Sequence, residues 1–101
     1  MVKSELVRVL SGKLPELQQK DVELALNCML RQMEEALVQG ERIEIRDFGS
    51  FDLHHRAPRI ARNPRTGEVV NLASKTAVHF KPGKDMKDRV NAAREQYVIG
   101  E

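Results

Sequence analysis

The stretch HRAPRIARNPRTGEVVNLASK, at residues 55–75, holds the densest basic chemistry of this sequence. Its arginines recur at three-residue intervals, at Arg56, Arg59, Arg62 and Arg65. Long guanidinium side chains on a slim segment suit the minor groove of DNA, because the negative potential of that groove attracts arginine. The spacing therefore favours the binding of a polyanion along the length of the segment.

The middle of this segment has the residues of a tight turn. In the run NPRTG, Pro64 occupies the second turn position and Gly67 stands where a positive φ is needed. The flanking residues then form a two-stranded ribbon, which is marginally stable in water unless a partner orders it. Pro64 has two interpretations. Its rigid ring could enter a base step and hold it unstacked, or it could only turn the chain in a solvated loop.

Charge is segregated along the chain. Residues 1–52 carry seven Lys or Arg against ten Asp or Glu, a net charge of −3, whereas residues 53–101 carry ten against five, a net charge of +5. Between residues 53 and 84, seven basic side chains stand against a single acid, Glu68. Such segregation indicates a polyanionic partner more than a generally soluble surface does.

The motifs of common catalytic and metal sites are absent. There is no glycine-rich phosphate loop, no G-x-S-x-G and no cluster of Cys and His with metal-ligand spacing. His54 and His55 point to opposite faces of an expected strand, so packing or phosphate contact suits them, and His79, better than metal binding. Cys28, surrounded by helix formers, is interpreted as a small core residue. We therefore expect no enzyme, no cofactor and no metal.

Two helices are expected before the basic segment. A short amphipathic helix begins at Ser4 and ends near Gly12. A longer one runs from about residue 18 to 39, because apolar side chains recur at three- and four-residue spacing and Gly40 follows where a C-terminal cap belongs. The apolar stripe of this longer helix consists of Val22, Leu26, Met29, Met33 and Leu37. We expect the stripe to serve as core or subunit contact.

Strands and a last helix are expected around the ribbon, which makes the fold class α+β. RIEIR, at residues 42–46, alternates with the period of a half-buried strand, a turn follows at DFG, and the strand resumes in SFDLHHRA. TAVHFK, at residues 76–81, is a further strand, and Pro82 with Gly83 ends it. The final helix, from about residue 84 to 97, places on one side Met86, Val90, Ala93 and Tyr97.

Chain length predicts one domain, with a helical part at residues 1–40, strands and basic arm at 41–82, and a last helix at 83–97. Without the ribbon and the ends, roughly 70 residues remain, a size at which a single hydrophobic core is marginal. We therefore expect a dimer with a shared core that includes Met29, Met33, Leu37, Phe48, Phe51 and Phe80. There is no 18-residue apolar run and no secretory signal, so we expect a cytoplasmic protein.

Five motifs give the chain a specific resemblance to a known family. They are, in order, KSEL, QGERIEIRDFGSF, HRAPR, RNPRTGEVV and HFKPGK, and the similarity runs from about residue 3 to 91. The chain resembles the bacterial HU and integration host factor family of DNA-bending proteins, and within it the beta-type subunits. This resemblance implies an intertwined dimer with a helical base, a small antiparallel sheet as a saddle, and two protruding β-ribbon arms that wrap the minor groove and insert a proline, the device known for this family.

The resemblance also implies which residues meet DNA. Pro64 is the inserted proline. Lys3 and Ser4 at the first helix start, and Gly83 with Lys84 at the last, match positions that clamp phosphates, since helix N-termini carry free N–H groups and a positive dipole. The full set of candidate DNA-binding residues is Lys3, Ser4, Glu44, Arg46, Arg56, Arg59, Arg62, Asn63, Pro64, Arg65, Lys75, Lys81, Gly83, Lys84 and Lys87. The implied partners are double-stranded DNA and a related alpha-type subunit, in the bacterial nucleoid.

Glu44 and Arg46 favour the beta-type interpretation over plain HU. They stand two apart on one expected strand face, where Glu44 would hold Arg46 extended to probe the groove; the alternative is an exposed ion pair of little energetic value.

Two features depart from the family. Asp47 stands where glycine is expected in many relatives, and it adds a negative charge near the DNA face. The tail AAREQYVIGE runs past the usual end, and we expect it only to lengthen the last helix.

Two other functions compete with architectural DNA bending in transcription, recombination and nucleoid organisation. An HU-like homodimer would bind DNA with little sequence preference. The same arm could also serve an RNA-binding protein. However, the wide, shallow minor groove of A-form RNA offers no step for a wedge proline, and RNA recognition uses aromatic stacking that the ribbon lacks.

Overall fold

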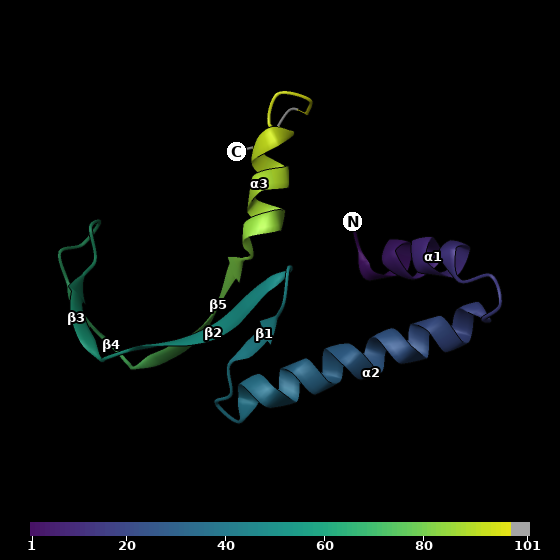
Figure 1. The fold of residues 1–101 in the computed structure, drawn as a ribbon. Helices are drawn as coiled ribbons and strands as arrows, with labels where there is room; N and C mark the ends of the chain where they lie inside the picture. The colour runs from purple at the N-terminus through teal and green to yellow at the C-terminus, as the bar shows by residue number, and fades with distance from the viewer. Residues whose placement is uncertain (98–101) are drawn as a thin grey trace.

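The computed structural model describes residues 1–97, which form three helices and five strands (Figure 1). Their order confirms the predicted α+β class, with helices before and after a group of antiparallel strands. In chain order the elements are α1 (Lys3–Lys13), α2 (Gln19–Val38), β1 (Ile43–Ile45), β2 (Gly49–Arg56), β3 (Arg59–Arg62), β4 (Val69–Leu72), β5 (Lys75–Pro82) and α3 (Lys84–Ala92).

Among the described residues, the buried apolar side chains lie between α1 and α2. Val7 of α1 packs against Val22 and Leu26 of α2, and Leu6 and Leu10 are partly buried beside them. Both helices begin and end within two residues of the predicted positions. Gly40 follows α2 with a φ of 84°, which confirms its predicted capping role, because glycine adopts this left-handed conformation without steric cost.

The central sheet has the strand order β1-β2-β5, and both pairs are antiparallel. Phe51 lies opposite Phe80, and their ring centroids are 4.8 Å apart; Phe48, in the turn after β1, lies 5.6 Å from Phe80. Because successive strand residues point to opposite faces, this apolar face is backed by a polar face that carries Asp52 and His79. The sheet therefore separates an aromatic cluster from a charged surface.

The two-stranded ribbon β3–β4 extends beyond the ends of β2 and β5 and turns away from the rest of the molecule (Figure 1). Arg59 pairs with Leu72 and Arg62 with Val69, and the ribbon forms a sheet of its own. This arrangement confirms the predicted protruding arm. We use the name arm for residues 59–72.

Helix α3 is shorter than predicted. It ends at Ala92, and residues 93–97 form turns in place of the expected last helical turn. Short helices depend on the packing of an apolar face, and here Val90 and Tyr97 are 62% and 72% exposed, so the described residues give little packing to support a further turn. The expectation that the tail lengthens the helix is therefore wrong up to Tyr97, and its remainder lies outside the described residues.

The single chain is extended and poorly enclosed. Its radius of gyration is 19.4 Å, whereas a compact domain of this length has about 13 Å. Its accessible surface is 9179 Å², whereas a compact monomer of this size exposes about 5800 Å². Cys28 is exposed, which contradicts its predicted core position, because α2 packs against α1 through one face only.

Among the described residues, no helix combines the length and the apolar character needed to cross a bilayer.

Candidate nucleic-acid interface

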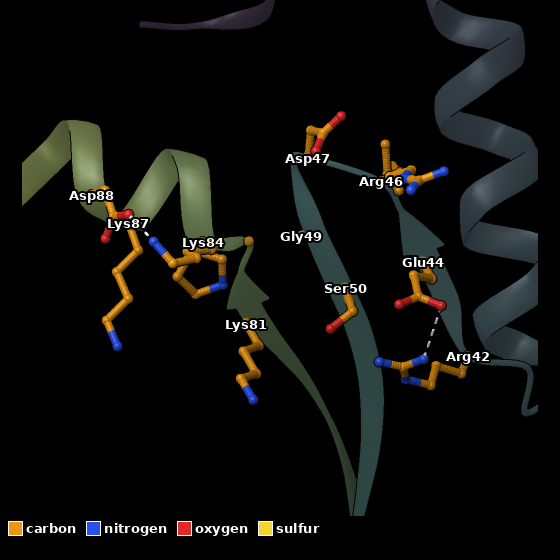
Figure 2. A pocket seen from close by; sticks show the side chains of 13 residues that line it. Arg42, Glu44, Arg46, Asp47, Gly49, Ser50, Lys81, Lys84, Lys87 and Asp88 are labelled. Atoms are coloured by element: carbon orange, nitrogen blue, oxygen red, sulfur yellow. Dashed lines mark hydrogen bonds and ion pairs between the residues drawn. The ribbon is translucent and has the colours of Figure 1, made fainter.

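A concave basic surface lies where the β1–β2 turn, the end of β5 and the start of α3 meet (Figure 2). We call it the basic cleft; its volume is about 610 Å³. Five basic side chains and three acidic ones line it, which leaves a net positive charge. The basic residues are Arg42, Arg46, Lys81, Lys84 and Lys87, and the acidic ones are Glu44, Asp47 and Asp88.

The tight turn after β1 shapes one wall of the basic cleft. Asp47 has a φ of 68°, the only positive φ of a non-glycine residue in the described chain. This conformation directs the chain into β2 at Gly49, where a Cβ atom would stand 2.6 Å from both the Lys81 carbonyl oxygen and the Phe80 ring. Position 49 therefore has no room for a side chain, and glycine is required there. The pattern DFG thus encodes a turn and a close approach of two strands.

The start of α3 forms the opposite wall. The Gly83 N–H donates to the Phe48 carbonyl oxygen at 2.8 Å, so this N–H is not free for an anion, contrary to the prediction for a helix N-terminus. The same bond joins α3 to the β1–β2 turn. Lys84 Nζ lies 2.7 Å from Asp88 Oδ2, one helical turn along α3. Lys84 therefore lines the basic cleft with its charge already partly balanced.

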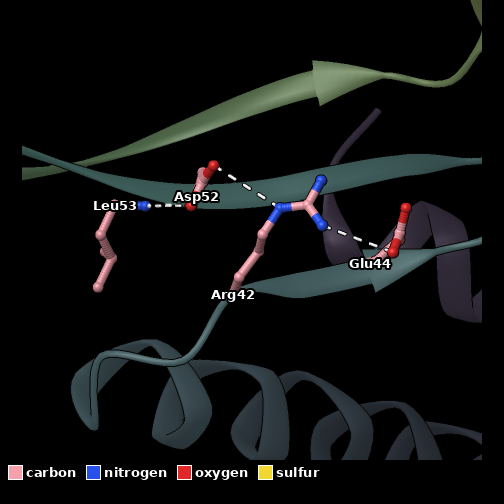
Figure 3. A network of polar contacts seen from close by, with 4 residues as sticks. All are labelled: Arg42, Glu44, Asp52 and Leu53. Carbon is pink, nitrogen blue, oxygen red and sulfur yellow. Dashed lines mark hydrogen bonds and ion pairs between the residues drawn. The ribbon is translucent and has the colours of Figure 1, made fainter.

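Arg42 connects two carboxylates on the polar face of the sheet (Figure 3). Its guanidinium lies 3.5 Å from Glu44 Oε2 and 3.7 Å from Asp52 Oδ2. The prediction that Glu44 holds Arg46 is therefore wrong for this chain. Arg46 lies in the turn beyond β1, off the strand face that Arg42 and Glu44 share, and the described residues give it no ion pair.

Local hydrogen bonds order the tip of the arm. The Asn63 side chain accepts the Arg65 N–H at 2.9 Å, its carbonyl accepts the Gly67 N–H at 2.8 Å, and its own N–H donates to the Glu68 carbonyl at 2.8 Å. Gly67 has a φ of 74°, which confirms the predicted turn glycine. Pro64 is exposed at this tip, where its ring is available to a ligand.

The arm arginines are distributed around the ribbon. Arg59 and Arg62 are three residues apart on β3, so their side chains leave opposite faces of the strand. Arg65 lies in the tip turn. Apolar side chains accompany them without burial, and Ile60 is 74% exposed. A slender segment with guanidinium groups on both faces suits a groove with two phosphate walls.

A third basic group lies between the basic cleft and the arm. Arg56 and Lys75 face each other where β2 ends and β5 begins. Next to them on the polar face, the rings of His54 and His79 stack with centroids 4.6 Å apart and planes 12° from parallel. We call this region the saddle floor.

The predicted DNA-binding residues thus fall into several groups. Six line the basic cleft: Glu44, Arg46, Lys81, Gly83, Lys84 and Lys87. Five belong to the arm: Arg59, Arg62, Asn63, Pro64 and Arg65. Lys3 and Ser4, in the first turn of α1, do not line the cleft, and Lys3 Nζ donates to the Asn27 side chain at 2.9 Å.

Sequence reasoning missed Arg42 and Asp88. Arg42 shares the period-two alternation that singled out Glu44, so the pattern RIEIR could have identified it. Asp88 stands four residues after Lys84, the spacing at which side chains of a helix meet. Arg42 and Asp88 form ion pairs with other charged residues of the region, and such partners do not follow from a search for phosphate contacts.

The chain is similar to known DNA-binding proteins in sequence and in structure. The family model for bacterial DNA-binding protein matches residues 1–91. Integration host factor subunit beta of Alkalilimnicola ehrlichii is 63% identical over 94 residues, covering 93% of this chain and 94% of that protein. The subunit beta of Methylococcus capsulatus is 57% identical over 95 residues, covering 94% and 100%. An HU–DNA cocrystal structure from Anabaena matches with a TM-score of 0.79 at 30% identity, covering 89% of this chain and 97% of that chain.

Proposed function

The chain belongs to the family of bacterial DNA-binding proteins, and we propose that it bends double-stranded DNA by inserting Pro64 into the minor groove. The observation that carries the proposal is the exposed proline at the tip of a hydrogen-bonded turn, on an arm with arginines on both faces. A proline ring has no N–H to leave unpaired among the bases, and it can hold a base step open. The protein is then an architectural component of DNA complexes and not an enzyme.

Phosphate contacts position the arm in this proposal. The basic cleft receives the DNA backbone on the saddle side, through Lys81, Lys84 and Lys87, and Arg56 with Lys75 continue the path toward the arm. Contacts of this kind carry charge but no sequence information. Arg46, which has no ion pair among the described residues, is the candidate for reading groove width or base edges.

A dimer is part of the proposal. The large accessible surface and the half-exposed Phe48 and Phe80 indicate that a second chain covers the aromatic cluster. Because the relatives at 63% and 57% identity are beta subunits, we propose a related alpha-type chain as partner, in the bacterial cytoplasm at the nucleoid, with roles in transcription, recombination and nucleoid organisation. An HU-like homodimer is the alternative. Sedimentation at micromolar concentration tests the dimer, and a copurified chain of similar mass separates the two forms.

The proline wedge is tested by Pro64→Ala on intact and nicked duplexes of one sequence, with the bend angle measured by fluorescence transfer. The exposed residue fills no core space, so the melting temperature stays unchanged, whereas the bend decreases because unstacking, a few kcal/mol per step, loses its compensation. A nicked duplex has already lost part of that stacking, so the variant recovers affinity on it.

Arg65→Ala is the matched control, since it removes a charge from the same turn and leaves the ring. It weakens binding and reduces the salt dependence, but the saturated complex keeps the parent bend angle. Equal bending by Pro64→Ala and the parent, with the same preference for nicked DNA, would reduce Pro64 to a turn residue. A stronger affinity for duplex RNA than for DNA would instead favour the RNA-binding alternative.

A further inference from the structure

The three histidines of the chain divide between the two faces of the central sheet. His54 lies opposite Ala77 and His79 opposite Asp52 on the β2–β5 pair, so both rings belong to the polar face, where they stack at 4.6 Å. His55 points to the other face, where its Nδ1 is 2.8 Å from the Thr76 hydroxyl. His54 and His79 are both exposed and have no hydrogen-bond partner among the described residues.

The surroundings of the stacked pair are mainly basic. Along the polar face, Arg56 and Lys75 lie on the arm side of the pair, and Lys81 lies on the cleft side. The nearby acids are Asp52 and Glu44, and the Arg42 guanidinium stands between them at 3.7 Å and 3.5 Å. The saddle floor therefore attracts anions. Its two central side chains, His54 and His79, add positive charge only when an imidazole is protonated.

We infer that His54 and His79 form a proton-linked phosphate contact, at which a DNA backbone phosphate is held and one proton per chain is taken up from solvent on binding. This inference rests on the proposed function, which brings the polar face of the sheet against DNA. Imidazole is the side chain that ordinarily gains or loses its charge between about pH 5 and 8. The imidazolium form adds an N–H donor and a positive charge, and hydrogen bonds from cations to phosphate are the stronger kind.

The stacked geometry sets the number of protons. Two imidazolium rings at a centroid distance of 4.6 Å repel each other, so a second proton is opposed as soon as the first has bound. A phosphate over the pair favours the first proton. Because the bound state holds more protons than the free state, affinity decreases as the pH rises, by at most about tenfold per pH unit for one proton.

Proton uptake is measured by titration calorimetry of the full-length dimeric protein with duplex DNA at pH 6.5, in two buffers of different ionisation enthalpy. The difference in observed enthalpy gives the number of protons, and we expect a value between zero and one per chain that falls toward zero at pH 8.

The double variant His54→Gln/His79→Gln abolishes this uptake, and relative to the parent it loses more affinity at pH 6.5 than at pH 8, because only the protonated pair adds a positive charge. His55→Gln is the matched control, because it removes an imidazole from the opposite face and leaves the uptake unchanged. If the double variant melts early, His54→Asn/His79→Asn gives the same readout, because it also removes both imidazoles.

Uptake that persists in the double variant, or an uptake of zero in the parent, overturns the inference while DNA binding stands. Failure of the parent to bind DNA at pH 8 refutes the proposed function instead.

Discussion

The basic cleft and the arm carry the same kind of charge, but different forces hold them. In the cleft, segments far apart in sequence touch each other: Gly49 lies against Lys81 and Phe80, and Gly83 donates to Phe48. In the arm, β3 and β4 pair only with each other, and the tip bonds join residues within five positions. The cleft is thus part of the folded core structure, whereas the arm is a local structure attached to it.

This difference assigns the two regions different parts of a binding reaction. In the proposed complex, a preformed cleft loses little conformational freedom when it meets phosphate, so it sets the position of the duplex. An arm with few buried contacts opens at low free energy cost, and it gains its order from the groove that encloses it. Changes to the packed contacts that shape the cleft should therefore alter folding stability and binding together, while changes to the arm should alter binding alone.

The largest expected effect on stability comes from Gly49→Ala. The added Cβ would stand 2.6 Å from the Lys81 carbonyl oxygen and from the Phe80 ring, so β2 and β5 must separate. We expect a loss of about 3 kcal/mol in the free energy of unfolding, measured by urea denaturation. Gly12→Ala in α1 is the control, because no atom lies within 4 Å of its Cβ position, and alanine there is neutral or stabilising.

The arm offers the contrasting glycine. Gly67 has open space around it but a φ of 74°, so Gly67→Ala strains the turn by about 1 kcal/mol without any clash. Since the arm takes no part in the core, the urea midpoint should stay at the parent value while DNA affinity falls. A midpoint shift as large as that of Gly49→Ala would contradict the separation of arm and cleft.

The features that sequence predicted well are those fixed by local periodicity. Helix α2, strand β1 and the NPRTG turn each depend on residues a few positions apart, and each was found where expected. The errors concern contacts across the fold. Glu44 pairs with Arg42, and the Gly83 N–H reaches Phe48; neither follows from spacing, because both depend on which segments lie side by side.

The length of α3 and the exposure of Cys28 mark a second limit. A helical pattern continues to Tyr97, but the described residues leave Val90 and Tyr97 exposed, and the helix ends at Ala92. Cys28 lies among helix formers, yet only one face of α2 is covered by α1. Periodicity shows which side chains are apolar but not what covers them, and for this chain the cover is the proposed second subunit.

A smaller effect is expected from Asp47→Gly, at the rim of the basic cleft. Asp47 has a φ of 68°, which glycine adopts without steric cost, so the variant gains up to about 1 kcal/mol of stability. It also removes a negative charge from the cleft and should bind DNA more tightly at low salt. Asp47→Asn separates the two causes, because asparagine tolerates this conformation and lacks the charge: affinity rises but the melting temperature does not. Unchanged affinity in both variants would place Asp47 away from DNA.

The smallest effect on stability should come from Lys84→Ala, which nonetheless gives the clearest binding signature of the cleft. Its ion pair with Asp88 is exposed, and such helical pairs contribute about 0.3–0.5 kcal/mol, so the melting temperature hardly moves. Each phosphate contact adds about −0.9 to the slope of log K against log salt, so removal of one contact flattens that slope by about one unit.

Asp88→Asn is the matched control: it breaks the same ion pair but keeps the lysine charge, so affinity rises while the slope does not flatten. The test is the affinity of each variant for one duplex, measured at salt concentrations from about 50 to about 200 mM. This range resolves a difference of roughly one unit in the slope. A parent-like slope in Lys84→Ala would remove this lysine from the phosphate path and leave the cleft to Lys81 and Lys87.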